Sequence, residues 1–301
     1  MGLTAYPNGV SSFGMPILGA SGAMTTGNIF FVDSGGTGRA DDASSGKSPA
    51  NPFVTLDFAI GQCTANNGDI IFLMPGHAEN IGASDVVMDV AGVSVLGLGH
   101  GNDRPTFTLD NAGSSIVMGA LTASTRLSNV ILSPGAASIV RAINLNGSAC
   151  EVDNVEFTTH ATNEFLVLIG CQGNNCIIRD CVLNSLDGAG AATGIELNGC
   201  DRVLVTRNII QGDFSTGAIE NATASALQAT ITHNIITNQS TSGTITMLAT
   251  ATGTLAHNAL SNRTTGLGTD VFVPGDCLCV ENYYVNDEDE ANVIIPTTPS
   301  T

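Results

Sequence analysis

The chain has 301 residues, with nine Lys and Arg against 27 Asp and Glu, and a formal net charge of −18. This acidic balance argues against nucleic acid and anionic membranes as partners, because both attract basic surfaces. Charged residues make up only 12% of the chain while Gly, Ser, Thr and Asn are abundant, which favours a β-rich fold with many turns over a helical one.

Residues 1–27 belong to an opening stretch that contains no Lys, Arg, Asp or Glu. The stretch lacks the basic start of a secretory signal and the unbroken apolar run of a membrane span, so we expect it to be retained. Its apolar residues stand among turn formers, which predicts an extended docking arm that orders on a partner. The alternative is that the arm packs along its own chain or along a neighbouring copy. The expected docking residues are Tyr6, Val10, Phe13, Met15, Ile17 and Leu18.

Residues 28–75 read as a cap made of a strand, a loop, a helix and a second strand. Pro52 can start the helix, and Phe53, Leu56, Ala59, Ile60 and Cys63 then share one helical face. The apolar run 69–74 predicts the second strand. The acidic loop 33–42 lacks the ligand spacing of an EF-hand, so we expect a surface loop and no Ca²⁺ site.

A short pattern recurs from Arg126 onward, with a strand before and after a pivot residue that is usually Asn. The gaps between successive pivots are 25, 26, 28, 26, 24 and 24 residues. Asn tolerates the left-handed backbone conformation of a tight turn, and stacked Asn side chains can bond one another as a ladder. The expected ladder consists of Asn129, Asn154, Asp180, Asn208, Asn234, Asn258 and Asn282.

The repeat length, the Asn column and the apolar residue after it resemble right-handed parallel β-helix proteins of the pectate-lyase-like class. The resemblance implies an all-β, single-stranded solenoid over residues 76–285 with about eight or nine coils, followed by an acidic and then Pro/Thr-rich tail over 286–301. The segment from Asp33 to Ile81 also resembles the opening of phage and bacterial β-helix proteins, with His77 and Glu79 at the end of the pattern. This fold serves lyases, adhesins and viral spikes, so it does not specify a function.

The polar positions beside the pivots offer the best local chemistry, and they include Asp153, Arg179, Arg207, His233 and His257. They form either a sugar or uronate site or a solvated face with charge pairs between coils, and the second interpretation is preferred. The two histidines form either a metal pair or a pair of neutral surface imidazoles, and again the second is preferred.

The cysteines at 171, 176 and 181 lack the short spacing of zinc sites, so we expect the eight cysteines to be reduced, buried thiols. The sequence therefore predicts no catalytic residue, no metal and no cofactor.

The resemblance and the plain coils predict a non-enzymatic structural virion protein. We expect a homotrimeric phage capsid decoration or head-fibre protein on the outer surface of the head, assembled in the host cytoplasm. Its arm would dock on the major capsid protein or another virion component. One alternative is a tail-spike-like polysaccharide depolymerase or lyase, which predicts two or three carboxylates within about 10 Å on one face and a glycan partner. Another is a bacterial surface adhesin.

Overall fold

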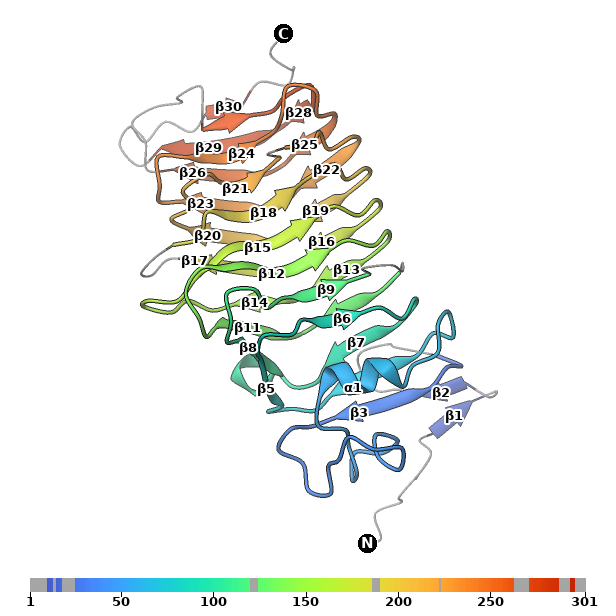
Figure 1. Ribbon diagram of the computed structural model, residues 1–301. Helices are drawn as coiled ribbons and strands as arrows, with labels where there is room; N and C mark the ends of the chain where they lie inside the picture. Colours follow the sequence, from blue (N-terminus) through green and yellow to red (C-terminus); the bar gives the residue numbers. More distant parts are fainter. Residues whose placement is uncertain are drawn as a thin grey trace, which may run out of the picture.

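The computed structural model describes residues 10–12, 15–17, 25–119, 124–185, 190–221, 223–262, 271–286 and 293–295. Within these residues the chain winds into a parallel β-solenoid whose coils each contribute one strand to three long sheets (Figure 1). The all-β parallel β-helix expected from the sequence is confirmed. The smallest of the three long sheets has eight strands, which agrees with the expected eight or nine coils.

Sheet 1 contains ten parallel strands. They are β3 (Ile29–Val32), β4 (Ile70–Leu73), β7 (Ser94–Gly97), β10 (Arg126–Ser128), β13 (Glu151–Asp153), β16 (Ile177–Arg179), β19 (Leu204–Thr206), β22 (Ala229–Thr232), β25 (Gly253–Ala256) and β28 (Leu278–Val280).

Sheet 2 contains ten strands, of which the last is antiparallel. They are β5 (Ala78–Ile81), β8 (Thr106–Leu109), β11 (Ile131–Pro134), β14 (Glu156–Phe157), β17 (Val182–Ser185), β20 (Ile209–Gly212), β23 (Ile235–Asn238), β26 (Ala259–Asn262), β29 (Asn282–Asn286) and β30 (Val293–Ile295).

Sheet 3 contains eight parallel strands. They are β6 (Val86–Met88), β9 (Ile116–Met118), β12 (Ile139–Leu145), β15 (Phe165–Cys171), β18 (Thr193–Leu197), β21 (Gly217–Glu220), β24 (Gly243–Thr246) and β27 (Phe272–Val273).

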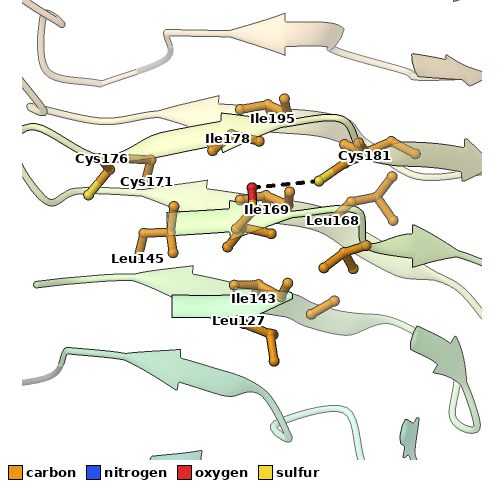
Figure 2. Close-up of a cluster of buried hydrophobic side chains, with 14 of the residues drawn as sticks. Leu127, Ile143, Leu145, Leu168, Ile169, Cys171, Cys176, Ile178, Cys181 and Ile195 are labelled. Carbon is orange, nitrogen blue, oxygen red and sulfur yellow. Dashed lines mark hydrogen bonds between the residues drawn. The ribbon is translucent and has the colours of Figure 1, made fainter. Parts of the chain in front are cut away.

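The core is a set of apolar columns inside the solenoid, because alternate residues of each strand point inward and coils stack in register. Figure 2 shows this stacking, with Ile143, Ile169 and Ile195 on successive strands of sheet 3. No single coil could bury these side chains alone, so stability comes from the stack. All eight cysteines are free, and all except Cys63 are buried in this interior, as expected.

The N-terminal cap closes the first coil with helix α1 (Leu56–Gly61), which buries Leu56, Ala59 and Ile60. The helix is shorter than the sequence suggested, because the Thr55 side chain caps it by accepting a hydrogen bond from the Phe58 N–H at 3.4 Å. Phe53 precedes the helix and is nevertheless buried. A 3₁₀ turn, η1 (Gly101–Asp103), follows β7.

His77 and Glu79 join this cap to the first coil. The Ser34 N–H donates to His77 Nδ1 at 3.0 Å, so the other ring nitrogen carries the proton and lies 3.2 Å from Glu79 Oε2. The same carboxylate oxygen accepts the N–H of Leu56 at 2.9 Å, at the start of α1. The residues that ended the cap pattern in the sequence therefore have a structural role.

The opening stretch contains an antiparallel hairpin of β1 (Val10–Ser12) and β2 (Met15–Ile17). Val10, Met15 and Ile17 lie in this hairpin, while Tyr6, Phe13 and Leu18 lie outside the described residues. In the tail, β30 pairs antiparallel with β29, so this part of 286–301 returns to the chain's own sheet.

The seven predicted ladder residues fall into two columns. Asn208, Asn234, Asn258 and Asn282 are buried and bond one another from coil to coil at 2.9–3.1 Å. Asn129, Asn154 and Asp180 lie one position earlier in the coil, in left-handed conformation, and share their column with Arg207, His233, His257 and Glu281. The predicted residues pass from one column to the other between Asp180 and Asn208, where the gap is 28 residues. The single ladder expected from the sequence is therefore wrong, and the structure has two adjacent columns.

Candidate functional site

A ladder of charges runs along the outer face of sheet 1. Arg126 donates to Asp153 at 2.8 and 3.0 Å, and Arg179 donates to Glu151 at 2.8 and 2.5 Å and to Asp180 at 2.9 Å. Arg207 then donates to both oxygens of Asp180 at 2.7 Å. The ladder alternates in sign from coil to coil, as parallel in-register strands favour.

The ladder continues as a pair of histidines. The rings of His233 and His257 lie 5.0 Å apart, and His257 Nδ1 lies 3.3 Å from Glu281 Oε2. His233 Nδ1 is 2.7 Å from its neighbour Thr232 Oγ1. Asp153 and Arg179 thus lie on strands, whereas Arg207, His233 and His257 occupy the adjoining turn column, so the polar positions do not form the single column expected.

Every carboxylate of the sheet 1 ladder has a guanidinium partner. The hydrogen bond from Arg207 holds the pKa of Asp180 below its ordinary value. A carboxyl group fixed in its ionised form by arginine cannot serve as a general acid near neutral pH. This face therefore matches the solvated face of paired charges better than the sugar site.

A second polar cluster lies on the outer face of sheet 3, where no candidate was expected. Glu196 of β18 and Glu220 of β21 are direct neighbours in the strand register. Arg141 Nε donates to Glu196 at 2.9 Å, and the Thr193 hydroxyl donates to Glu220 at 3.0 Å. We call Arg141, Thr193, Glu196 and Glu220 the sheet 3 cluster.

Gly170 makes the contact between Arg141 and Glu196 possible. The two residues lie on strands β12 and β18, and strand β15 with Gly170 runs between them. A Cβ atom at position 170 would lie 2.8 Å from both Cδ and Nε of Arg141. The guanidinium therefore crosses β15 over a position where only glycine leaves its path free.

The two carboxylates of the cluster have different environments. The Glu196 side chain is 14% exposed and has the Arg141 guanidinium beside it. Among the described residues Glu220 has no cationic partner within salt-bridge distance, and it accepts a hydrogen bond from a buried hydroxyl. Two adjacent carboxyl groups in unlike surroundings are a recurrent basis for acid–base chemistry.

A small hollow lies where sheet 2 passes into sheet 3, and no residue of the sheet 3 cluster lines it. It encloses about 10 Å³, room for one water molecule, and its lining includes His160, Glu164 and Asn184. Asn184 Oδ1 is buried there and has no hydrogen-bond partner among the described residues. The hollow lies beside the two coils that contain β15 and β18. The unbonded acceptor, Asn184 Oδ1, therefore belongs to the same coil as Glu196.

The thiols are unreactive where burial dominates. Burial raises the pKa of Cys63 and Cys181 to about 12, and that of Cys277 and Cys279 to about 11. Within the described parts of the chain, no three His, Cys, Asp or Glu side chains converge as metal ligands. Over the same residues, no helix has the length and apolar character to cross a bilayer.

The comparisons with known proteins agree with the fold. No protein-family model and no curated protein matches the sequence. A solved rhamnogalacturonan lyase is similar with a TM-score of 0.54 and 12% identity, over 91% of this chain and 87% of the lyase. The crystal structure of pectate lyase Pel9A is similar with a TM-score of 0.44 and 13% identity, over 88% of this chain and 78% of the other. The first of these matches shows that the parallel β-helix fold of the chain resembles that of a rhamnogalacturonan lyase, and identity this low defines the fold alone.

Proposed function

We propose that the outer face of sheet 3 binds a polysaccharide and that Glu196 and Glu220 cleave its glycosidic bonds. The observation that carries the proposal is the pairing of these residues on neighbouring strands with different partners. Neighbouring strands lie about 4.8 Å apart. Retaining glycosidases hold their two carboxyl groups about 5–5.5 Å apart, so the spacing suits this reaction.

The roles follow from the surroundings of each carboxyl group. The Glu196 carboxylate, held in place by the hydrogen bond from Arg141, attacks the anomeric carbon as the bond between this carbon and the glycosidic oxygen breaks. That oxygen takes the bonding electron pair and receives the proton of the Glu220 carboxyl group. Water then attacks the anomeric carbon and gives a proton back to Glu220. This attack breaks the bond between the anomeric carbon and Glu196, and hydrolysis is complete.

The test is a screen of the full chain against neutral and acidic polysaccharides, with release of new reducing ends as the readout. The variants are E196Q and E220Q, and E151Q is the matched control on the sheet 1 ladder. We expect cleavage of at least one polymer, a loss of about 100-fold or more in both sheet 3 variants, and full activity in E151Q. Absence of cleavage across the panel, or equal loss in E151Q, would overturn the proposal. Ultraviolet absorbance from unsaturated sugar ends would instead indicate elimination, as in a lyase.

A second proposal is the homotrimeric virion protein expected from the sequence, and the outer face of sheet 2 favours it. Three large apolar side chains there are exposed in one column: Ile209 by 40%, Ile235 by 55% and Tyr283 by 48%. A neighbouring copy could cover this uncharged column in an otherwise acidic protein. Sedimentation of the full chain and of I235K tests it, because a monomer at micromolar concentration would contradict the trimer. The right-handed winding of the coils also stays a prediction, favoured because parallel strand crossovers are almost always right-handed.

A further inference from the structure

The first three strands of sheet 1 are apolar on both faces. Phe30, Ile71 and Val95 point into the solenoid core. The residues beside them point outward, yet Ile70 is only 4% exposed, Phe72 4% and Leu96 6%.

This outward apolar cluster is separate from the core. The apolar side chains packed against the trio are Ile29, Phe31 and Leu98, which lie on the same outward face. The rings of Phe31 and Phe72 stack with their centroids 5.9 Å apart. In the column of Ile70 the apolar residues end at Ser94 of β7, and in the column of Phe72 and Leu96 they end at Ser128 of β10. Strands buried on both faces are typical of sheets covered by a second layer.

We infer that the β1–β2 hairpin of the same chain forms this second layer. The first argument is position: Thr25 is hydrogen-bonded to the Gly68 carbonyl, and Asn28 N–H donates to Asp69 Oδ1 at 2.6 Å. Thr25 and Asn28 are thereby held at the beginning of β4, close to Ile70 in the chain. Figure 1 draws the β1–β2 hairpin at the same end of the solenoid as β3.

The second argument is composition. Residues 1–24 contain no Lys, Arg, Asp or Glu, although the whole chain carries 36 such residues. A segment that lies on an apolar surface away from water should lack charges, because burying an unpaired charge is costly.

The third argument is the hairpin itself. Two antiparallel strands without further support are marginally stable in water and need a packing partner. The geometry thus assigns the hairpin to this face of its own chain, in place of a docking site on a capsid.

The test compares I70S with L278S, two changes to serine in the same outward column of sheet 1. Ile70 is 4% exposed and Leu278 is 49% exposed. We expect I70S to lower the melting temperature of the full chain by several degrees and L278S to leave it almost unchanged. In a chain lacking residues 1–24, I70S should have no further effect, because the layer that covers Ile70 is already gone. A full effect of I70S in the shortened chain would overturn the inference.

Limited proteolysis gives a second readout in case the shortened chain does not fold. In the full chain, I70S should make the sequence before Thr25 cleavable well before the solenoid, whereas L278S should leave it as resistant as in the wild type. Equal cleavage in all three proteins would contradict the inference. A melting temperature that falls on dilution, together with dimers or trimers in sedimentation, would show that the segment covers a neighbouring copy and would also overturn it.

Discussion

The side-chain oxygen of Asn234 accepts hydrogen bonds from both the backbone N–H and the side-chain amide of Asn208, each at 3.0 Å. The Asn234 amide in turn donates to Asn258 Oδ1 and to the Val205 carbonyl, both at 3.0 Å. One side chain therefore satisfies polar groups of three successive coils at a sharp turn that excludes water. Four predictions follow from this ladder and from the polar clusters.

N234A should lower the free energy of unfolding by about 3 kcal/mol or more, because it leaves several buried donors and acceptors without partners. The control is N154G at the exposed left-handed position of an earlier coil, where glycine adopts the same conformation without strain. Its cost should stay below about 1 kcal/mol. Chemical denaturation measures both values, and equal losses would refute the two-column arrangement.

G170A should lower polysaccharide cleavage and leave the fold intact. The new methyl group would displace the flexible Arg141 side chain, not backbone, so the guanidinium would move away from Glu196. We expect kcat to fall about tenfold or more with a smaller change in KM, because Arg141 positions Glu196 for the reaction. Circular dichroism and melting temperature serve as controls for the fold. Unchanged kcat would show that the contact across β15 has no role in the reaction.

R179M should destabilise the protein by about 1–3 kcal/mol, because Arg179 is the cation between Glu151 and Asp180. The loss should grow at low salt, where repulsion among the remaining carboxylates is less screened. R207M is the matched control, since Arg207 is 55% exposed and, among the described residues, forms an ion pair only with Asp180. Its effect should be clearly smaller than that of R179M, because solvent screens an exposed ion pair. Urea titrations at two salt concentrations measure the free energy of unfolding of both variants. Equal losses in R179M and R207M would contradict the stabilising role of the ladder.

Asp69 should make the N-terminal cap sensitive to acid. Burial by itself raises the pKa of this carboxyl group, but hydrogen bonds from Thr64, Asn28 and Asn67 outweigh burial and hold the pKa below 3.8. Asp69 therefore contributes stability above the ordinary carboxyl pKa, and this contribution is lost as the pH falls through the lower folded value. Thermal unfolding at a series of pH values should show a smaller acid-induced loss in D69N than in the exposed control D89N. Identical curves would argue against this role.

The sequence was sufficient for the architecture, because the interior columns recur at nearly constant spacing and in-register stacking leaves little freedom. It did not reveal the change of register after Asp180. A left-handed turn position and the buried position next to it both favour Asn, so a single sequence column concealed two structural ones.

The sheet 3 cluster escaped sequence reasoning for a different reason. Glu196 and Glu220 belong to strands without a recurring motif, and only the strand register brings them together. Their separation of one coil was the available signal. The path of Arg141 over Gly170 crosses an entire strand, and no local pattern in the sequence predicts it.

The last strand also determines how the molecule ends. Because β30 runs antiparallel to β29, it turns the exposed edge of sheet 2 into one whose direction no longer matches an incoming parallel coil. A second molecule that approached with its coils in the same direction would meet no parallel partner strand at this edge of sheet 2. The reversed strand thus disfavours end-to-end stacking of molecules through sheet 2.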